Sequence, residues 1–323
     1  MKKILITILI AIASGQVVSA QQDPAYSMYM FNGLFLNPAY AGSQEAISLM
    51  GIYREQWVGV QGAPRTANIS VHAPLRQDQY ALGLTLSNDM YGKSNTFSVT
   101  PSFAYRLRIK KSRLCFGVQA SLASYYQNSQ AIKLATDATD VPYQWNQNLF
   151  VPNFGFGIYA YGERYFAGIS VPHLLPNRLR DGVGIVGYNS NIARLYNYYL
   201  LTAGYVFGKD ASVVKFRPSI LVKYQKGLPN NIPQFDANLA LLIIERLWLG
   251  AGYRTGGDQA YTGQSVIIFA QFKVTPQLQI GYSYDAELTA LRHFTSGTHE
   301  VMIGYDFWYD KKRFVSPRYI KYF

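Results

Sequence analysis

The chain has 323 residues and a formal net charge of +12, and it is 49% hydrophobic but only 15% charged. Soluble domains carry about 25% charged residues, so the composition argues against an ordinary soluble protein. The basic residues are scattered along the chain, which argues against nucleic acid as a partner. Anionic lipid headgroups or the acidic face of a protein suit the positive charge better.

Residues 1–20 have the pattern of an export signal. Lysines at positions 2 and 3 precede an apolar run over 4–13, and small residues at 18–20 form a cleavage site. We therefore expect a signal peptide that is removed after residue 20. Cys115 is the only cysteine, so the sequence offers neither a lipid attachment site at the new N-terminus nor an intramolecular disulfide.

Residues 21–44 are expected to form a plug inside a barrel or across its periplasmic mouth. Tyr26, Met30 and Phe31 belong to a run of large apolar side chains that does not alternate and that needs burial. Turn-forming residues follow, and a structural turn between plug and barrel wall is favoured over ligand contact. The candidate plug and junction residues are Asn37, Pro38, Ala39, Tyr40 and Gly42.

The rest of the chain is dominated by alternation with a period of two residues. Between 79 and 87, Leu82, Leu84 and Leu86 point one way and small or polar residues point the other, which is typical of a strand. Similar stretches recur to the end of the chain, with no amphipathic helix of comparable length between them. The predicted strands lie near 45–54, 65–73, 79–88, 95–107, 113–125, 153–162, 164–171, 197–208, 213–224, 234–244, 246–254, 264–274, 278–286 and 299–309.

These strands predict an all-β fold, a transmembrane antiparallel β-barrel of about 14 strands over residues 45–310, in the outer membrane. No apolar run after the signal approaches the roughly 20 residues of a membrane helix, and in lipid only helices and closed barrels satisfy every backbone polar group. The residues expected to face lipid include Leu82, Leu84, Leu86, Ile280, Tyr282 and Tyr284. Those expected to face the lumen include Gln279, Gly281, Ser283, Asp285, Lys215, Arg217 and Lys223.

The connections between the predicted strands fall into two lengths. Short ones at 162–163 and at Glu245 suit periplasmic turns, whereas 127–152 and 172–196 suit extracellular loops. These loops form a contact surface or fold into the lumen, and plain solvated loops are an equally good interpretation. An even strand count then places both chain ends on the periplasmic side. Residues 311–323 are expected to be a basic periplasmic tail, whose candidate docking residues are Lys311, Lys312, Arg313, Arg318, Tyr319 and Phe323. An equally good interpretation is that the terminal aromatic residues serve only barrel insertion or pack back into the lumen.

Four segments of the chain carry a family resemblance. DPAYSMYMFNGLFLNPAYAGS, YREQWVGVQGAPRT, SGTHEVMIGYDF and the ending SPRYIKYF occur in this order from residue 23 to residue 323. Together they resemble the PorP/SprF family of the Bacteroidetes type IX secretion system. The resemblance implies an outer-membrane barrel tied to type IX secretion and, in some members, to gliding motility. It also implies two classes of partner, a large secreted substrate or its C-terminal domain and, in one branch, a peptidoglycan-associated periplasmic lipoprotein.

A polar group inside the barrel is a further candidate site. Its members are Arg54, Gln56, Trp57, His299, Glu300 and Asp306. Because charges inside a barrel normally pair, a lumen network of Arg54 with Glu55 or Asp306 is as good an interpretation as a partner-binding rim. The four histidines lack metal-ligand spacing and no serine lies in a nucleophile-elbow motif. We expect no catalytic, metal or cofactor site, and hence no enzyme.

Two functions remain open on the sequence. The first is a non-enzymatic component of type IX secretion that supports the export or surface anchoring of an adhesin-like substrate and couples it to periplasmic machinery. The second is a channel for small or hydrophobic solutes that resembles the FadL type, suggested by the strand number, the N-terminal plug and the Asn-Pro-Ala element at 37–39.

Overall fold

The computed structural model describes residues 25–75, 78–128, 146–176, 197–209, 212–225, 232–256 and 264–307. The predicted signal peptide at 1–20 and the predicted tail at 311–323 lie outside the described residues. Within the described ranges, no helix is long and apolar enough to cross a membrane.

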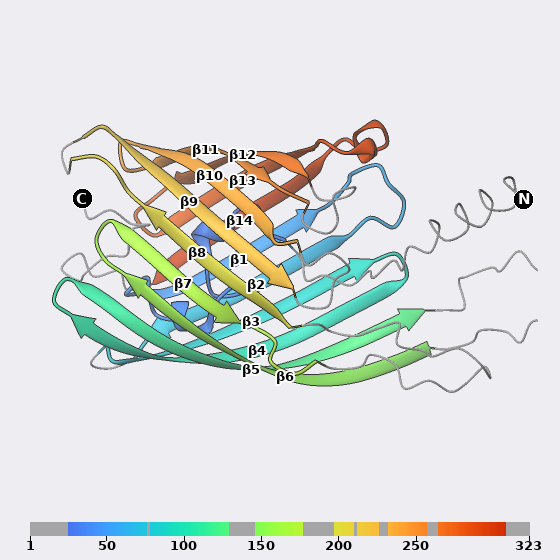
Figure 1. Ribbon diagram of the computed structural model, residues 1–323, viewed down its shortest axis with the longest axis horizontal. Helices are drawn as coiled ribbons and strands as arrows, with labels where there is room; N and C mark the ends of the chain where they lie inside the picture. Colours follow the sequence, from blue (N-terminus) through green and yellow to red (C-terminus); the bar gives the residue numbers. More distant parts are fainter. Residues whose placement is uncertain are drawn as a thin grey trace, which may run out of the picture.

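Fourteen strands form one closed antiparallel barrel, as predicted (Figure 1). Each strand pairs with its neighbours in the sequence, and β14 closes the ring on β1. The strands are β1 (Ile47–Glu55), β2 (Arg65–Pro74), β3 (Tyr80–Tyr91), β4 (Ser94–Ile109), β5 (Ser112–Asn128), β6 (Asn146–Tyr161), β7 (Tyr165–Val171), β8 (Tyr198–Tyr205), β9 (Val214–Gln225), β10 (Gln234–Ile243), β11 (Leu247–Arg254), β12 (Ser265–Lys273), β13 (Leu278–Glu287) and β14 (Thr298–Phe307).

The alternation in the sequence becomes an outer and an inner face of the wall. On β13, Ile280 and Tyr282 are exposed on the outer face, whereas Ser283 and Asp285 are buried. The same holds on β9, where Arg217 is buried between exposed Phe216 and half-buried Pro218. A slip of one residue would move every polar side chain to the lipid face, so this pattern fixes the register of the strands.

One expected loop is shorter than the sequence suggested. Residues 127–152 were expected to be a loop, but β5 continues to Asn128 and β6 begins at Asn146, with these two residues paired. This stretch was predicted as a loop because its polar residues and Pro152 are typical of loops. Pro152 is tolerated in β6 because β7 pairs only from Phe156 onward, so this part of β6 has no paired β7 residue.

The two ends of the barrel differ. At one end, which we call the turn end, the connections are 75–79, 110–111, 162–164, 206–213, 244–246 and 274–277. The other end, the loop end, carries the longest connections, at 129–145 and 172–197, and the short helix η3 (Ala290–His293). In outer-membrane barrels the short turns face the periplasm and the long loops face outside.

Residues 25–46, here called the N-terminal segment, lie within the ring of strands (Figure 1). They contain two short 3-10 helices, η1 (Tyr29–Phe31) and η2 (Pro38–Tyr40). Ala25 lines a cavity with Tyr91 and Gln234 at the loop end, whereas Glu45 contacts Arg113 at the turn end. The described start of the chain therefore lies in the lumen toward the loop end, whereas Ile47 and Phe307, the two ends of the strand ring, are paired at the turn end as an even strand count requires.

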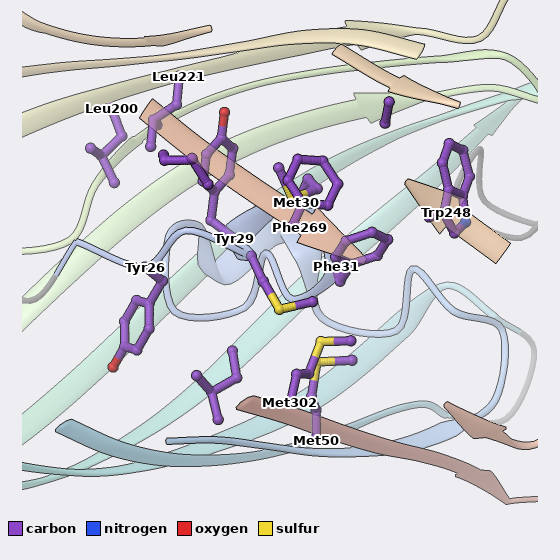
Figure 2. Close-up of a cluster of buried hydrophobic side chains, with 14 of the residues drawn as sticks. Tyr26, Tyr29, Met30, Phe31, Met50, Leu200, Leu221, Trp248, Phe269 and Met302 are labelled. Carbon is purple, nitrogen blue, oxygen red and sulfur yellow. The ribbon is translucent and has the colours of Figure 1, made fainter. Parts of the chain in front are cut away.

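Apolar side chains join this segment to the wall. Figure 2 shows Tyr26, Tyr29, Met30 and Phe31 packed among side chains from the strands. The Phe31 ring lies 6.0 Å from that of Phe269 between centroids, in an edge-to-face arrangement. A second cluster surrounds Leu34, Ala39, Tyr40 and Ala41. Exposing this much apolar surface to water is unfavourable, and packing inside the lumen buries it.

Candidate functional site

The Asn-Pro-Ala element fixes the N-terminal segment to the wall. The Asn37 side-chain carbonyl accepts a hydrogen bond from the Ala39 backbone amide at 2.9 Å, which caps η2. Its amide group donates to the backbone carbonyls of Ile158 at 2.9 Å and Ile169 at 3.2 Å. Asn37 therefore bridges β6 and β7, and at this position the structure shows a turn with wall contacts.

The remaining candidate junction residues lie close by. Tyr40 and Ala39 are buried, and Gly42 has a φ of +74°, which favours glycine. The Gly42 backbone amide donates to His72 Nδ1 at 3.2 Å, and His72 meets the Tyr40 ring edge to face. A plug function for the N-terminal segment remains a prediction, since these contacts describe its position alone.

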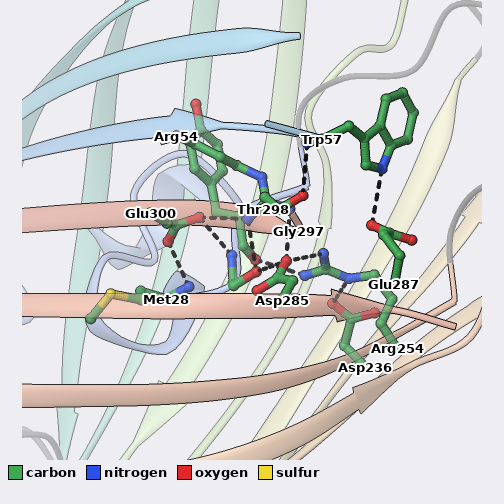
Figure 3. A network of polar contacts seen from close by, with 12 residues as sticks. Met28, Arg54, Trp57, Asp236, Arg254, Asp285, Glu287, Gly297, Thr298 and Glu300 are labelled. Atoms are coloured by element: carbon green, nitrogen blue, oxygen red, sulfur yellow. Dashed lines mark hydrogen bonds and ion pairs between the residues drawn. The ribbon is translucent and has the colours of Figure 1, made fainter. Parts of the chain in front are cut away.

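A buried ionic network holds the other end of the segment (Figure 3). Arg54 pairs with Asp285 at 2.8 Å and with Glu300 at 3.1 Å, and all three side chains are at most 2% exposed. The backbone amides of Ser27 and Met28 donate to the two oxygens of Glu300 at 2.9 and 2.8 Å. The Glu300 carboxylate thus joins the segment to β1 and β14.

Arg254 extends this network along the wall to β10 and β11. It pairs with Asp236 at 2.8 Å and with Asp285 at 3.5 Å, and it donates to the backbone carbonyl of Tyr26 at 3.1 Å. Buried charges are costly unless they are paired and hydrogen-bonded. Here each charged side chain has both an ion-pair partner and a hydrogen bond, supplied by residues from six parts of the chain, so the network forms only when barrel and segment have folded together.

The structure brings together only some of the predicted lumen residues. Arg54 and Glu300 are paired as described, and Trp57 lies nearby with its indole N–H donating to Glu287 at 2.9 Å. Gln56 lies just beyond β1, where its backbone amide donates to the Pro64 carbonyl. These four residues lie near the loop end of β1, β13 and β14.

Three other expectations for this network are wrong. His299 lies on the outer face, where its ring contacts the Tyr282 hydroxyl at 2.6 Å, because it alternates with the inward-facing Glu300. Asp306 is buried six residues further along β14, which is about 20 Å from Glu300 at the usual strand rise. Glu55 pairs with Arg65 in a partly exposed ion pair and not with Arg54.

A second ionic network, which the sequence analysis missed, lies at the turn end. Glu45 contacts Arg106, and it pairs with Arg113 at 3.1 Å and accepts from the Tyr161 hydroxyl at 2.9 Å. Burial raises the pKa of the Glu45 carboxyl, and the guanidinium groups of Arg106 and Arg113 oppose that shift. The alternation of β4 and β5 indicates that Arg106 and Arg113 point inward. Nothing in the sequence, however, identifies Glu45 as their partner.

Between the two networks an arginine lies against aromatic rings. The guanidinium carbon of Arg217 lies 4.1 Å from the Trp248 ring centroid and 5.2 Å from that of Phe31. Such cation–π contacts stabilise a buried cation, by about 2 kcal/mol or more where water is excluded. Phe31 belongs to the N-terminal segment, so this contact is a third attachment between segment and wall.

A cavity of about 180 Å³ lies toward the loop end, beside the N-terminal segment. One wall is polar and is formed by Thr85, Ser87, Thr96, Ser98, Thr100 and Ser121 on β3, β4 and β5. The facing wall is largely apolar and includes Tyr26, Phe35, Leu36, Leu200 and Leu221, with Lys223 and Asp236 as charged members. Asn68 also lines the cavity, and its buried side-chain carbonyl has no hydrogen-bond partner among the described residues.

The half of the lumen nearer the turn end contains a much smaller cavity. A second cavity, between Asn37, Tyr40, Tyr159 and Phe166, has a volume of about 20 Å³, which is room for about one water molecule. Among the described residues no group of three or more His, Cys, Asp or Glu side chains could hold a metal ion. The candidate docking residues at 311–323 lie outside the described residues.

A closed 14-strand barrel with lipid-facing aliphatic side chains and a polar, ion-paired interior defines an outer-membrane β-barrel protein. The chain belongs to the type IX secretion system membrane protein PorP/SprF family, whose model matches residues 18–305. Family and fold together indicate a non-enzymatic role in the outer membrane.

Solved structures of other barrels are similar in outline. A FadL homologue of Pseudomonas aeruginosa is 14% identical over 90% of this chain and 96% of its own, with a TM-score of 0.48. The toluene transporter TbuX of Ralstonia pickettii is 12% identical over 84% and 92%, with a TM-score of 0.49. The outer membrane protein Omp33 of Acinetobacter baumannii is 10% identical over 82% and 100%, with a TM-score of 0.45. No curated protein matches the chain significantly.

Proposed function

We propose that this barrel retains a secreted, adhesin-like protein, or its C-terminal domain, at the cell surface during type IX secretion. In this proposal the N-terminal segment is a plug that closes the periplasmic half of the lumen. The protein would act as a receptor that is open toward the outside, and its periplasmic side would couple to other parts of the machinery, including a peptidoglycan-associated lipoprotein.

The observation that carries the proposal is the unequal filling of the two halves of the lumen. The N-terminal segment is tied to the wall by Asn37 and Glu45 toward the turn end and by Ser27 and Met28 toward the loop end. The larger cavity lies toward the loop end, between the segment and β3–β5. A fixed segment with the larger cavity on its loop-end side supports holding a ligand that enters from outside.

The chemistry of the cavity suits part of a protein. Hydroxyl groups on three adjacent strands offer donors and acceptors to a peptide backbone, and the apolar wall offers contact area to side chains. Residues on one face of a strand repeat every 6.6 Å or so, which is also the repeat of an extended peptide. An extended segment of the secreted partner could therefore bond to several hydroxyl groups in turn.

A substitution that fills the cavity tests the proposal. Ser98→Trp should abolish co-purification of the secreted partner from native outer membranes and lower its amount at the cell surface. Val99→Trp is the matched control, because Val99 neighbours Ser98 on β4 but lies on the outer face. Both variants should remain heat-modifiable barrels. Retention of the partner by folded Ser98→Trp at wild-type stoichiometry would contradict the proposal.

The apolar wall of the cavity favours one alternative, a channel for small or hydrophobic solutes. Tyr26, Leu200 and Leu221 could contact such a solute. Composition analysis of the barrel purified from native membranes separates the two functions. A stoichiometric protein partner supports the receptor, and a lumen that contains lipid or another hydrophobic molecule without a protein partner supports the channel.

A further inference from the structure

The turn end carries an uneven distribution of charge. Five basic side chains are exposed there among the described residues, Arg108, Lys110, Lys111, Lys209 and Arg246. Glu163 is the one exposed acidic side chain among the described residues of the same connections. The other acidic groups near this end are half-buried or buried and contact basic partners, as Glu245 does with Lys215 and Asp78 with Arg113. The exposed surface is therefore strongly basic.

These basic residues lie on neighbouring turns. The β4–β5 and β6–β7 hairpins are joined by a hydrogen bond from the Tyr165 hydroxyl to Ser112 at 2.7 Å. The backbone amide of Val206 donates to the Arg164 carbonyl, and that of Ile244 donates to the Val213 carbonyl. Because neighbouring strands are about 4.8 Å apart, the three steps from the β4–β5 turn to the β10–β11 turn cover about 30 Å.

Two aliphatic side chains lie within this arc. Val213 is 64% exposed and Ile244 is 66% exposed, and they are adjacent through the backbone hydrogen bond just described. Lys209 precedes Val213, and Arg246 follows Ile244. An exposed apolar pair flanked by like charges has the composition of a small protein interface, in which apolar anchors are surrounded by a charged rim.

Arg108 faces the mouth of the barrel on the lumen side of the wall. Arg108 is paired in register with Arg113, whose side chain points into the lumen toward Glu45. It thus has the inward phase of β4, and its exposure is to the aqueous mouth of the barrel. Lys110 and Lys111 form the tip of the same two-residue turn.

We infer that this basic arc is a docking surface for the acidic face of a periplasmic protein. Val213 and Ile244 supply apolar contact, and the five cations supply complementary charge and steer association. The inference deepens the coupling to periplasmic machinery in the proposed function, and it does not depend on residues 311–323. Its test measures binding at the turn end, whereas the cavity variants measure partner retention at the loop end, so either can fail alone.

The first test uses the full chain in phosphatidylcholine nanodiscs and a fluorescent polyglutamate peptide. The peptide should bind wild-type protein, and K110E/K111E should weaken binding by about tenfold or more. Raising the salt from about 50 mM to about 200 mM should weaken binding to wild-type protein as well. K93E is the matched control, because Lys93 is exposed in the two-residue β3–β4 turn at the loop end. Equal binding by K110E/K111E, K93E and wild-type protein would overturn the inference.

The second test identifies what contacts the arc in cells. A photoreactive phenylalanine derivative at Ile244 should form a protein adduct that K110E/K111E abolishes and K93E preserves. The same derivative at Phe294, which is exposed near η3 at the loop end, should not form this adduct. An adduct with phospholipid alone at Ile244 would assign the arc to headgroups and overturn the inference, as would a protein adduct that is indifferent to K110E/K111E.

Discussion

Asn37 of the N-terminal segment occupies the space that a side chain at position 157 would need. A Cβ built on Gly157 would overlap the Asn37 side-chain oxygen, and one built on Gly117 would overlap the backbone of Ala39. Glycines on β5 and β6 therefore allow the segment to lie directly on the wall. The same contacts set the register of the segment against the barrel.

Gly117→Ala should destabilise the folded protein by about 3 kcal/mol, because the new methyl group has only backbone atoms to displace. Urea unfolding of the purified barrel in detergent, followed by heat-modifiable migration, measures this loss. Gly51→Ala is the control on β1, where the nearest atom, Cγ2 of Ile303, lies at an ordinary contact distance of 3.5 Å. Equal unfolding midpoints for the two variants would show that the segment does not press on the wall.

Glu300→Ala should cost about 3–5 kcal/mol in stability, because it leaves Arg54 and two backbone amides of the segment without this acceptor in a buried site. Glu55→Ala removes a partly exposed ion pair with Arg65 and should cost less than about 1 kcal/mol. Unfolding midpoints of both variants, measured in the same detergent, test the difference. A small effect of Glu300→Ala would mean that the loop-end network is not part of the folded core.

Leu84→Arg should prevent or weaken insertion, because a cation on the lipid face near the middle of the bilayer costs about 2–4 kcal/mol. Thr85→Arg, one residue further along β3, places the same cation in the cavity and should insert with a smaller loss. Folding yield into phosphatidylcholine vesicles distinguishes the two. The reverse order of yields would show that the register of β3 is wrong.

The alternation of the sequence predicted the barrel because its period belongs to single strands and requires no knowledge of distant residues. Leu82 and Ile280 face lipid, and Asp285 faces the lumen, for this local reason alone. The predicted start of β6 was too late. The error is confined to Pro152 and the polar residues before it, which have the composition of a loop. The inner and outer faces of the wall are thus a local property.

The partners inside the lumen could not be predicted in the same way. Arg54 pairs with Asp285 and Glu300, which lie more than two hundred positions away in the chain. Such pairs depend on how the ring closes and on the stagger between strands, which no local pattern contains. The path of the N-terminal segment through the lumen also depends on how the ring of strands closes. For that reason the sequence analysis paired Arg54 with Glu55 or Asp306 instead of Asp285 and Glu300, and it did not predict that the described start of the segment lies toward the loop end.

Truncation after Asp310 tests the predicted tail. The shortened chain should remain a folded barrel in the outer membrane, because the described strands end at Phe307. It should lose its periplasmic partner on co-purification, since Lys311 and Arg318 supply charge and Phe323 an apolar anchor. Quantitative mass spectrometry of the purified complex provides the measurement. If the partner stays at wild-type stoichiometry, the tail is not the docking element, and the basic arc at the turn end remains as a separate site.

Single-channel conductance measured in planar bilayers tests the central claim, that the N-terminal segment closes the lumen. The wild-type barrel should show little or no ion conductance, because the segment is tied to the wall at both ends. Deletion of residues 25–36 should lower the yield of folded barrel, and the barrels that do fold should conduct. Large, steady conductance of the wild-type protein, or a folded deletion variant that conducts no more than the wild type, would contradict the account.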